Sequence, residues 1–175
     1  IGQEGYRMQR IVDGLIQLAL LDERPSLDVT PFDLGGLVNS VVSDFAITTT
    51  THAFRTAAEA GHLTISSDQD RVRQVLVALL NNAAQHTPPG TTVTLDAVQH
   101  ANCAVITVSD DGPGIEEQHL DRLFDRFYRV HRADGSGRRS GGLGLSIVRA
   151  LVALLGGNIS VDSTVAVGTS FRVEI

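Results

Sequence analysis

The 175-residue sequence contains no tryptophan and no lysine, and it has a single cysteine. All 14 basic residues are therefore arginines, which excludes a catalytic lysine. The one cysteine, Cys103, permits neither an intrachain disulfide nor a cysteine metal site, and its apolar, strand-like surroundings predict a buried, reduced thiol. No run reaches the roughly 18 apolar residues that span a membrane, and no signal peptide is recognisable. The net charge of -6 argues against a nucleic-acid-binding surface.

The amino-terminal segment predicts an amphipathic helix over residues 6–22. Its apolar side chains recur at roughly 3-4-3 spacing, as in helices that pack against partner helices in a bundle or dimer. The alternative is a helix packed on its own domain. Pro25 cannot continue a helix, so we place a domain boundary between residues 1–24 and 25–175. The sequence does not begin with Met, and we expect a piece of a longer protein. The apolar positions are Met8, Ile11, Leu15, Leu18 and Leu21.

The remaining sequence alternates helix and strand patterns. One helix is expected to start at residues 30–33 and to bury positions 34–42, and another follows the capping residue Asp68. The polar run 48–51 fits neither pattern. Helices packed on a mostly antiparallel sheet, a two-layer α/β sandwich, accommodate this order of elements. The further helices are expected at 69–86, 116–123 and 144–155, and the strands at 63–65, 92–98, 103–109, 159–161 and 169–175.

Two glycine-bearing turns carry the strongest chemical pattern. Asp110 ends an apolar strand, and Gly112 and Gly114 let the backbone after it approach a flat ring closely. The second turn, residues 140–145, contains Gly142 and Gly144 and runs directly into a helix whose free N–H groups favour an anion. Each turn alone is a weak signal. Together they predict a site for a purine nucleotide, with a carboxylate for the base and a helix start for the phosphates.

Polar residues elsewhere in the sequence fit such a site. Asn82, on the long helix, is either an ordinary surface or capping residue or an oxygen ligand for Mg²⁺. His86 lies at the end of that helix, where the dipole favours a histidine. Four arginines between the two turns either form a solvated surface or contribute to a phosphate clamp. The glycine-containing loop 133–142 is a candidate mobile lid. The arginines are Arg129, Arg132, Arg138 and Arg139.

Taken together and in order, these segments resemble the catalytic ATP-binding domain of two-component sensor histidine kinases, in the superfamily with the Bergerat fold. Residues 70–88 resemble its N box, residues 110–115 the G1 box, residues 122–129 the F box and residues 140–148 the G2 box. The resemblance implies that Asn82 holds Mg²⁺, that Asp110 binds adenine, and that residues 1–24 belong to the second helix of a dimerisation hairpin. The ATP-binding residues it implies are Asn82, His86, Asp110, Gly112, Gly114, Ile115, Tyr128, Arg129, Arg138, Gly142, Leu143, Gly144 and Leu145.

The function implied by the resemblance is transfer of the ATP γ-phosphoryl group to a histidine, for relay to a response-regulator aspartate. The family's acceptor histidine is followed by an acidic residue, whereas no histidine of this sequence is. The acceptor is therefore expected outside this chain, on a dimerisation domain in the same or another polypeptide. The resemblance further implies a cytoplasmic location, a homodimeric full-length protein, and no contact of these residues with nucleic acid or membrane.

Three departures from the family pattern leave alternatives open. Ala78 replaces an Asn one helical turn before Asn82, Gln85 replaces a Lys, and Ser140 replaces the first glycine of the G2 box. A lost charge-assisted contact costs ~1.5–3 kcal/mol, so nucleotide binding is expected to be weaker than usual. One alternative is a degenerate nucleotide-binding or dimerisation module without kinase activity. The other is an ATPase of the gyrase or chaperone kind, but Ala78 cannot supply the general base which that reaction requires.

Overall fold

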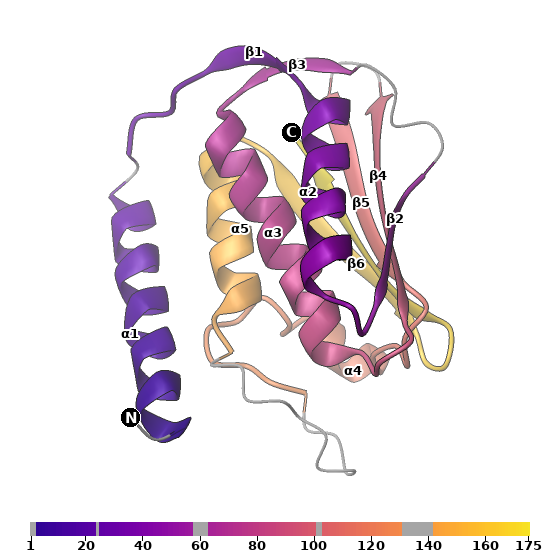
Figure 1. Cartoon of the computed structure of the whole chain (residues 1–175). Coiled ribbons are helices and arrows are strands. Elements are labelled where there is room, and N and C mark those ends of the chain that lie inside the picture. Colours follow the sequence, from indigo (N-terminus) through magenta and orange to yellow (C-terminus); the bar gives the residue numbers. More distant parts are fainter. Residues whose placement is uncertain (1–2, 24, 58–62, 101–102, 131–141) are drawn as a thin grey trace.

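The computed structural model describes residues 3–23, 25–57, 63–100, 103–130 and 142–175. These residues form five helices and seven strands, and Figure 1 shows their arrangement. The helices are α1 (Gln3–Asp22), α2 (Leu34–Thr48), α3 (Gln69–His86), α4 (Glu117–Leu120) and α5 (Gly144–Leu154). The strands are β1 (Thr30–Asp33), β2 (Ala53–Thr56), β3 (Thr64–Ser67), β4 (Thr92–His100), β5 (Cys103–Asp110), β6 (Asn158–Thr164) and β7 (Gly168–Glu174).

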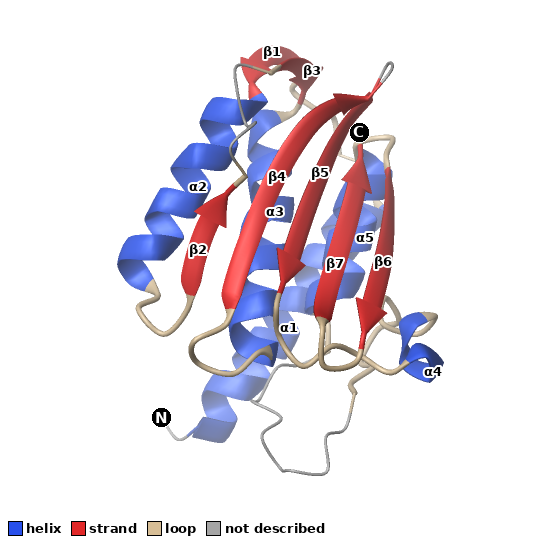
Figure 2. Ribbon diagram, turned by 90° about the vertical axis from the view of Figure 1, so that its right-hand side faces the viewer, coloured by secondary structure: helices blue, strands red, loops and turns tan. Residues whose placement is uncertain are grey.

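Five of the strands form one sheet in the order β2-β4-β5-β7-β6. All neighbours in this sheet run antiparallel except β2 and β4, which run parallel. The helices α2, α3 and α5 cover one face of the sheet and leave the other face open (Figures 1 and 2). The predicted two-layer α/β sandwich is therefore confirmed.

The core lies between this sheet and its helices. Alternate residues of β4, Val93, Leu95 and Ala97, are buried, as expected for a strand with one covered face. α3 opposes them with side chains at helical spacing, among which Leu76 and Leu79 are 0% exposed. Asp68 caps α3 as predicted, since its Oδ1 accepts a hydrogen bond from the Arg71 amide at 3.0 Å.

Two of the short strands differ from the sequence prediction. Residues 30–33 form β1, which pairs with β3, and the predicted helix, α2, begins directly after them at Leu34, with Asp33 at its N-cap position. The carboxylate of Asp33, which was expected near that helix start, accepts a hydrogen bond from the Leu63 amide at 3.3 Å instead of capping α2. The sequence pattern also missed β2, which directly follows the unassigned run 48–51. Cys103 is half-exposed, so the prediction of a buried thiol was wrong.

α1 ends at Asp22, shortly before Pro25, as predicted. The apolar residues of α1 divide between two sides: Leu18 (2% exposed) and Leu21 (5%) are buried, whereas Met8 (67%) and Leu15 (40%) are exposed. α1 contacts α5, and Asp22 pairs with Arg126 at 3.2 Å. The helix thus packs on the rest of the chain and still presents an apolar outer side. Among the described residues, no helix is long and apolar enough to cross a membrane.

Candidate functional site

The predicted site residues converge at one end of the sandwich. β5 ends there at Asp110, α3 ends there at His86, and α5 begins there at Gly144 (Figures 1 and 2). Thr87, the residue after α3, has its methyl group against Gly112, because a Cβ on that glycine would lie 2.7 Å from Thr87 Cγ2. α3 also packs along α5. The fold therefore brings together three segments that are far apart in the sequence.

The first turn holds the carboxylate of Asp110 in a defined position. Asp110 is half-buried, and its Oδ1 accepts a hydrogen bond from the Gly112 amide at 2.9 Å. The neighbouring Asp111 is exposed and has a different role, since its Oδ1 accepts from the Thr92 amide at 2.7 Å and closes the end of the β4–β5 ladder. Of the two carboxylates, Asp110 is therefore the one held within the turn, whereas Asp111 is bonded to β4.

The hairpin between β6 and β7 supports this turn from the other side. The Ile115 amide donates to Ser163 Oγ at 2.9 Å, and the Ala166 amide donates to the Pro113 carbonyl at 2.9 Å. Gly114 has φ +69°, and a Cβ there would overlap the Thr164 carbonyl, so only glycine fits. The backbone of the first turn is therefore held by hydrogen bonds along most of its length.

Sequence reasoning missed two polar residues behind Asp110. Thr169 lies opposite Asp110 in the β5–β7 ladder, is 7% exposed, and shares a 3.0 Å hydrogen bond with Ser163. Ser163 also donates to the Gly168 carbonyl at 2.9 Å. Both residues sit in short polar-apolar alternations that predict a strand and give no further signal. Their role depends on strand register, which a single sequence does not specify.

The second turn combines a tight backbone with open space. Gly142 has φ +70°, and a Cβ there would come within 2.9 Å of the Phe127 backbone, whose amide donates to the Gly142 carbonyl at 2.8 Å. Leu143 is 4% exposed and packs against Gly14 of α1. At Gly144, the first residue of α5, an added Cβ would meet nothing within 4 Å. None of the described residues therefore gives a steric reason for glycine at Gly144, whereas a bare backbone at a helix start suits the approach of an anion.

The amide predicted to hold the metal lies on the same end of α3. Asn82 is half-buried, and its side chain makes no hydrogen bond to any residue that the structure describes. The amide is therefore open to water or to a ligand as far as the described residues show. His86, one turn later, is exposed at the end of the helix. Ala78, the departure from the family pattern, packs against the core and brings no polar atom to the site.

The F-box residue Tyr128 contacts residues of α4 and of the F box itself. Tyr128 hydrogen-bonds His119 Nδ1 at 2.7 Å, and the Arg122 guanidinium lies 4.4 Å from its ring centroid. Arg129 is half-buried and forms no ion pair within the described part of the chain. The predictions for Arg138, Ser140 and most of the lid loop fall on residues 131–141, outside the described residues.

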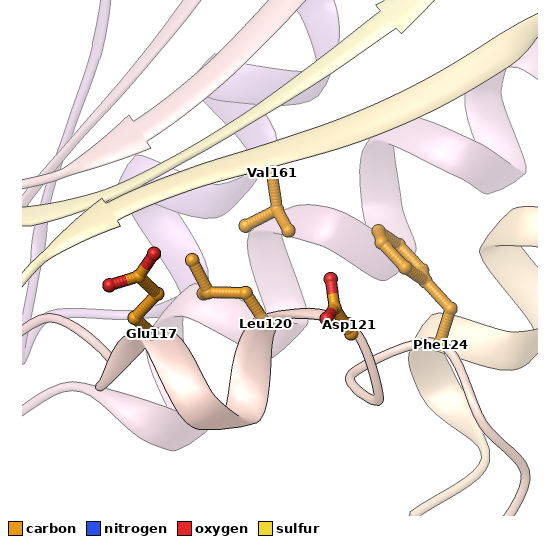
Figure 3. A pocket seen from close by; sticks show the side chains of 5 residues that line it. All are labelled: Glu117, Leu120, Asp121, Phe124 and Val161. Carbon is orange, nitrogen blue, oxygen red and sulfur yellow. The ribbon is translucent and has the colours of Figure 1, made fainter.

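A separate cavity of about 430 Å³ lies between α4 and the edge strand β6 (Figure 3). Its lining combines two carboxylates with apolar side chains, so its charge opposes a polyphosphate. It contains none of the predicted nucleotide-binding residues, and the two glycine turns remain the better candidate. The lining residues are Glu117, Leu120, Asp121, Phe124 and Val161.

Comparison with known proteins identifies the family of this chain. Residues 67–175 match the family described as histidine kinase-, DNA gyrase B-, and HSP90-like ATPase. Sensor histidine kinase TrcS of Mycobacterium tuberculosis is 37% identical over 100% of this chain and 35% of its own length. Sensor protein IrlS of Burkholderia pseudomallei is 34% identical over 98% of this chain and 37% of its own length. The chain thus spans little more than a third of these curated relatives.

Solved structures show the same fold. Full-length ShkA in complex with AMPPNP aligns with a TM-score of 0.82 and 26% identity, over 98% of this chain and 36% of ShkA. Histidine kinase ThkA in complex with the response regulator protein TrrA aligns with a TM-score of 0.75 and 25% identity, over 98% of this chain and 48% of ThkA. The chain belongs to the histidine kinase-, DNA gyrase B-, and HSP90-like ATPase family, as a sensor histidine kinase ATPase domain.

Proposed function

We propose that this chain binds ATP at the two glycine turns and transfers its γ-phosphoryl group to a histidine that lies outside these residues. The observation that carries the proposal is the pairing of a fixed carboxylate, Asp110, with a sterically open helix start at Gly144, at one end of the fold. Family membership and the AMPPNP complex of ShkA support the same nucleotide.

Each end of the nucleotide has its own set of residues in this proposal. The Asp110 carboxylate accepts a hydrogen bond from the exocyclic amine of adenine, and the bare backbone of Gly112 and Gly114 lies along the ring. The amides at the start of α5 donate to the phosphates, and the positive end of the helix dipole adds to their attraction. Arg129 lies between the two turns in the sequence and contributes charge to the phosphates, with Arg138 on the lid.

The residues also suit a magnesium ion. The amide oxygen of Asn82 is a ligand type that Mg²⁺ prefers, in combination with phosphate oxygens and waters. When bound, the ion would neutralise charge on the β- and γ-phosphates. Phosphoryl transfer needs little covalent chemistry from the protein, so the contribution of this chain is to position the nucleotide and to neutralise its charge.

The partners follow from the histidine that this chain does not supply. We propose a dimerisation domain bearing the acceptor, a cytoplasmic location, and a response regulator as the next recipient, as the ThkA–TrrA complex supports. Residues 1–24 would belong to the second dimerisation helix, and the exposed apolar side of α1 would contact another copy. That side includes Met8, Val12, Leu15, Ile16 and Leu20.

A water-activating ATPase is the less favoured function. Ala78 is half-buried against the core, and the position one turn before Asn82 therefore carries no carboxylate to deprotonate water. A degenerate module without kinase activity remains the alternative motivated by Ala78 and Gln85, and it predicts nucleotide binding without phosphoryl transfer.

The first test is ATP binding by calorimetry in the presence of Mg²⁺, for the wild type and for Asp110→Asn. Asp111→Asn is the matched control, because it makes the same charge change next door and keeps the oxygen that accepts from Thr92. We expect Asp110→Asn to abolish binding and Asp111→Asn to preserve it. Wild-type binding should then support phosphorylation of a histidine-bearing dimerisation fragment. An absence of binding at millimolar ATP would refute the proposed site.

A further inference from the structure

His52 is a buried histidine that neither the sequence motifs nor the proposed nucleotide site includes. It lies immediately before β2 and is 8% exposed. Its ring centroid is 6.2 Å from that of Phe54 in the core. A buried imidazole needs partners for both ring nitrogens, and the identity of those partners shows what the residue holds in place.

The hydrogen bonds of His52 form a chain with a single direction. Thr87 Oγ1 donates its proton to the Ala83 carbonyl at 2.8 Å, so it can only accept from His52 Nε2, 3.0 Å away. The His52 ring therefore carries a proton on Nε2, and in the neutral ring Nδ1 accepts from the Thr51 hydroxyl at 2.9 Å. Each hydrogen bond fixes the direction of the next one.

The backbone on both sides of His52 is held by the turn that follows α3. The Gly90 amide donates to the Thr51 carbonyl at 2.8 Å, and the Ala53 amide donates to the Thr91 carbonyl at 3.0 Å. The imidazole is thereby fixed relative to the end of α3, at which Thr87 lies. His52 therefore holds the Thr87 hydroxyl in a fixed position through the Nε2 hydrogen bond.

Thr87 in turn contacts the proposed adenine-binding turn at Gly112. With its hydroxyl committed to His52 and Ala83, the rotamer of Thr87 places its methyl group against Gly112. The Gly112 amide in turn donates to Asp110 Oδ1 at 2.9 Å. A rotation of Thr87 would push the side chain into Gly112 or leave a gap beside it, and either change moves the carboxylate.

We propose that His52 is a positioning residue for adenine recognition: through Thr87 and Gly112 it fixes the Asp110 carboxylate where the exocyclic amine of adenine binds. This inference rests on the proposed nucleotide site and assigns a specificity-determining role to a residue outside the four boxes. A histidine that served only the core would affect all nucleotides alike.

The test compares ATP with inosine triphosphate, which has the same phosphates and a carbonyl in place of the amine. His52→Leu removes the Nε2 donor at similar volume, and His52→Gln keeps an amide donor at the same reach. Thr87→Val keeps the methyl group and replaces the hydroxyl with a second methyl group. We expect His52→Leu and Thr87→Val each to weaken ATP binding about threefold to tenfold, the value of one hydrogen bond. Inosine triphosphate affinity should change less than about twofold, because inosine lacks the exocyclic amine that donates to Asp110 in the proposed site.

Three further variants distinguish a positioning role of His52 from a purely structural one. His52→Gln should restore most of the preference for ATP, and the double variant His52→Leu/Thr87→Val should be no worse than either single variant, because both break one chain. His100→Leu, at an exposed histidine, is the matched control and should bind both nucleotides as the wild type does. Urea unfolding of each variant without nucleotide reports on folding separately.

Equal losses for both nucleotides, or a His52→Gln variant as impaired as His52→Leu, would reduce His52 to a core residue and overturn the inference. The same holds if His52→Leu folds and retains full preference for ATP. If the wild type bound ATP no better than inosine triphosphate, while Asp110→Asn changed nothing, the adenine site itself would be refuted and the role of His52 with it.

Discussion

Replacing Gly144 by alanine separates the demands of the fold from those of the nucleotide. A Cβ at this position would meet no atom of the described protein within 4 Å, and Gly144 is the first residue of α5. Alanine also loses less conformational freedom than glycine when a helix forms. We therefore expect Gly144→Ala to fold normally and to gain up to about 1 kcal/mol in free energy of unfolding.

Nucleotide binding should move in the opposite direction. The new methyl group occupies the open space beside the amides at the start of α5, where the phosphates are proposed to lie. Loss of one charge-assisted hydrogen bond costs ~1.5–3 kcal/mol, so ATP affinity should fall by about tenfold or more. Calorimetry with ATP gives this number, and urea unfolding without nucleotide gives the stability.

Adenosine provides the control within the same variant. It lacks the phosphates and relies on the Asp110 turn, which Gly144→Ala does not touch, so its affinity should stay at the wild-type value. Unchanged ATP affinity in Gly144→Ala would show that the phosphates do not lie at the start of α5. An equal loss for adenosine and ATP would instead indicate that the variant distorts the whole site.

Four further substitutions test the fold. Gly114→Ala places a Cβ in a left-handed conformation and onto the Thr164 carbonyl, and should lower the free energy of unfolding by at least ~1–2 kcal/mol in urea titrations. Leu76→Ala empties a 0% exposed position in the core and should cost about 2–5 kcal/mol by the same measurement, more than any surface change. Leu15→Glu, on the outer side of α1, should leave stability within ~0.5 kcal/mol and weaken any self-association seen by sedimentation. Leu18→Glu, at 2% exposure on the inner side, should destabilise the chain.

The long, strongly periodic elements were predictable because their patterns are local. α3 has a capping aspartate at Asp68, a regular apolar face and a stop at Pro88, and its observed bounds are the predicted ones. The two strands that were missed, β1 and β2, lacked such a pattern. β1 contains Pro31, which the sequence pattern took for a helix start, and β2 has only four residues and pairs in parallel with a strand far along the chain. Neither pairing leaves a local signal.

The candidate site was predictable to the extent that it depends on glycine. Gly112, Gly114 and Gly144 mark backbone that must approach something closely, and this requirement is visible in the sequence. The supporting residues are not visible in this way. Ser163 and His52 act through register and through contacts between distant segments, and their residue types are common in ordinary strands and loops.

For α1, the apolar periodicity did not determine which side chains are buried. The apolar spacing correctly predicted a helix, but α1 packs on α5 of the same chain, which was the alternative to packing in a bundle or dimer. The spacing could not say which side would be covered. Gly14 and Leu18 turn out to face α5, and Leu15 faces outward. Because adjacent apolar stripes on a helix differ by a fraction of a turn, one sequence pattern can serve two interfaces.

The two halves of the site are held by different kinds of contact. The Asp110 half is fixed by hydrogen bonds to Ser163 and to the β6–β7 hairpin, and by the contact of the Thr87 methyl group with Gly112. In the Gly144 half, by contrast, Leu143 is covered by α1 through apolar contact at Gly14. Hydrogen bonds constrain the direction of the groups that they join, whereas apolar burial is not directional. A displacement of α1 would therefore reach the phosphate-binding half first and leave the adenine-binding half in place.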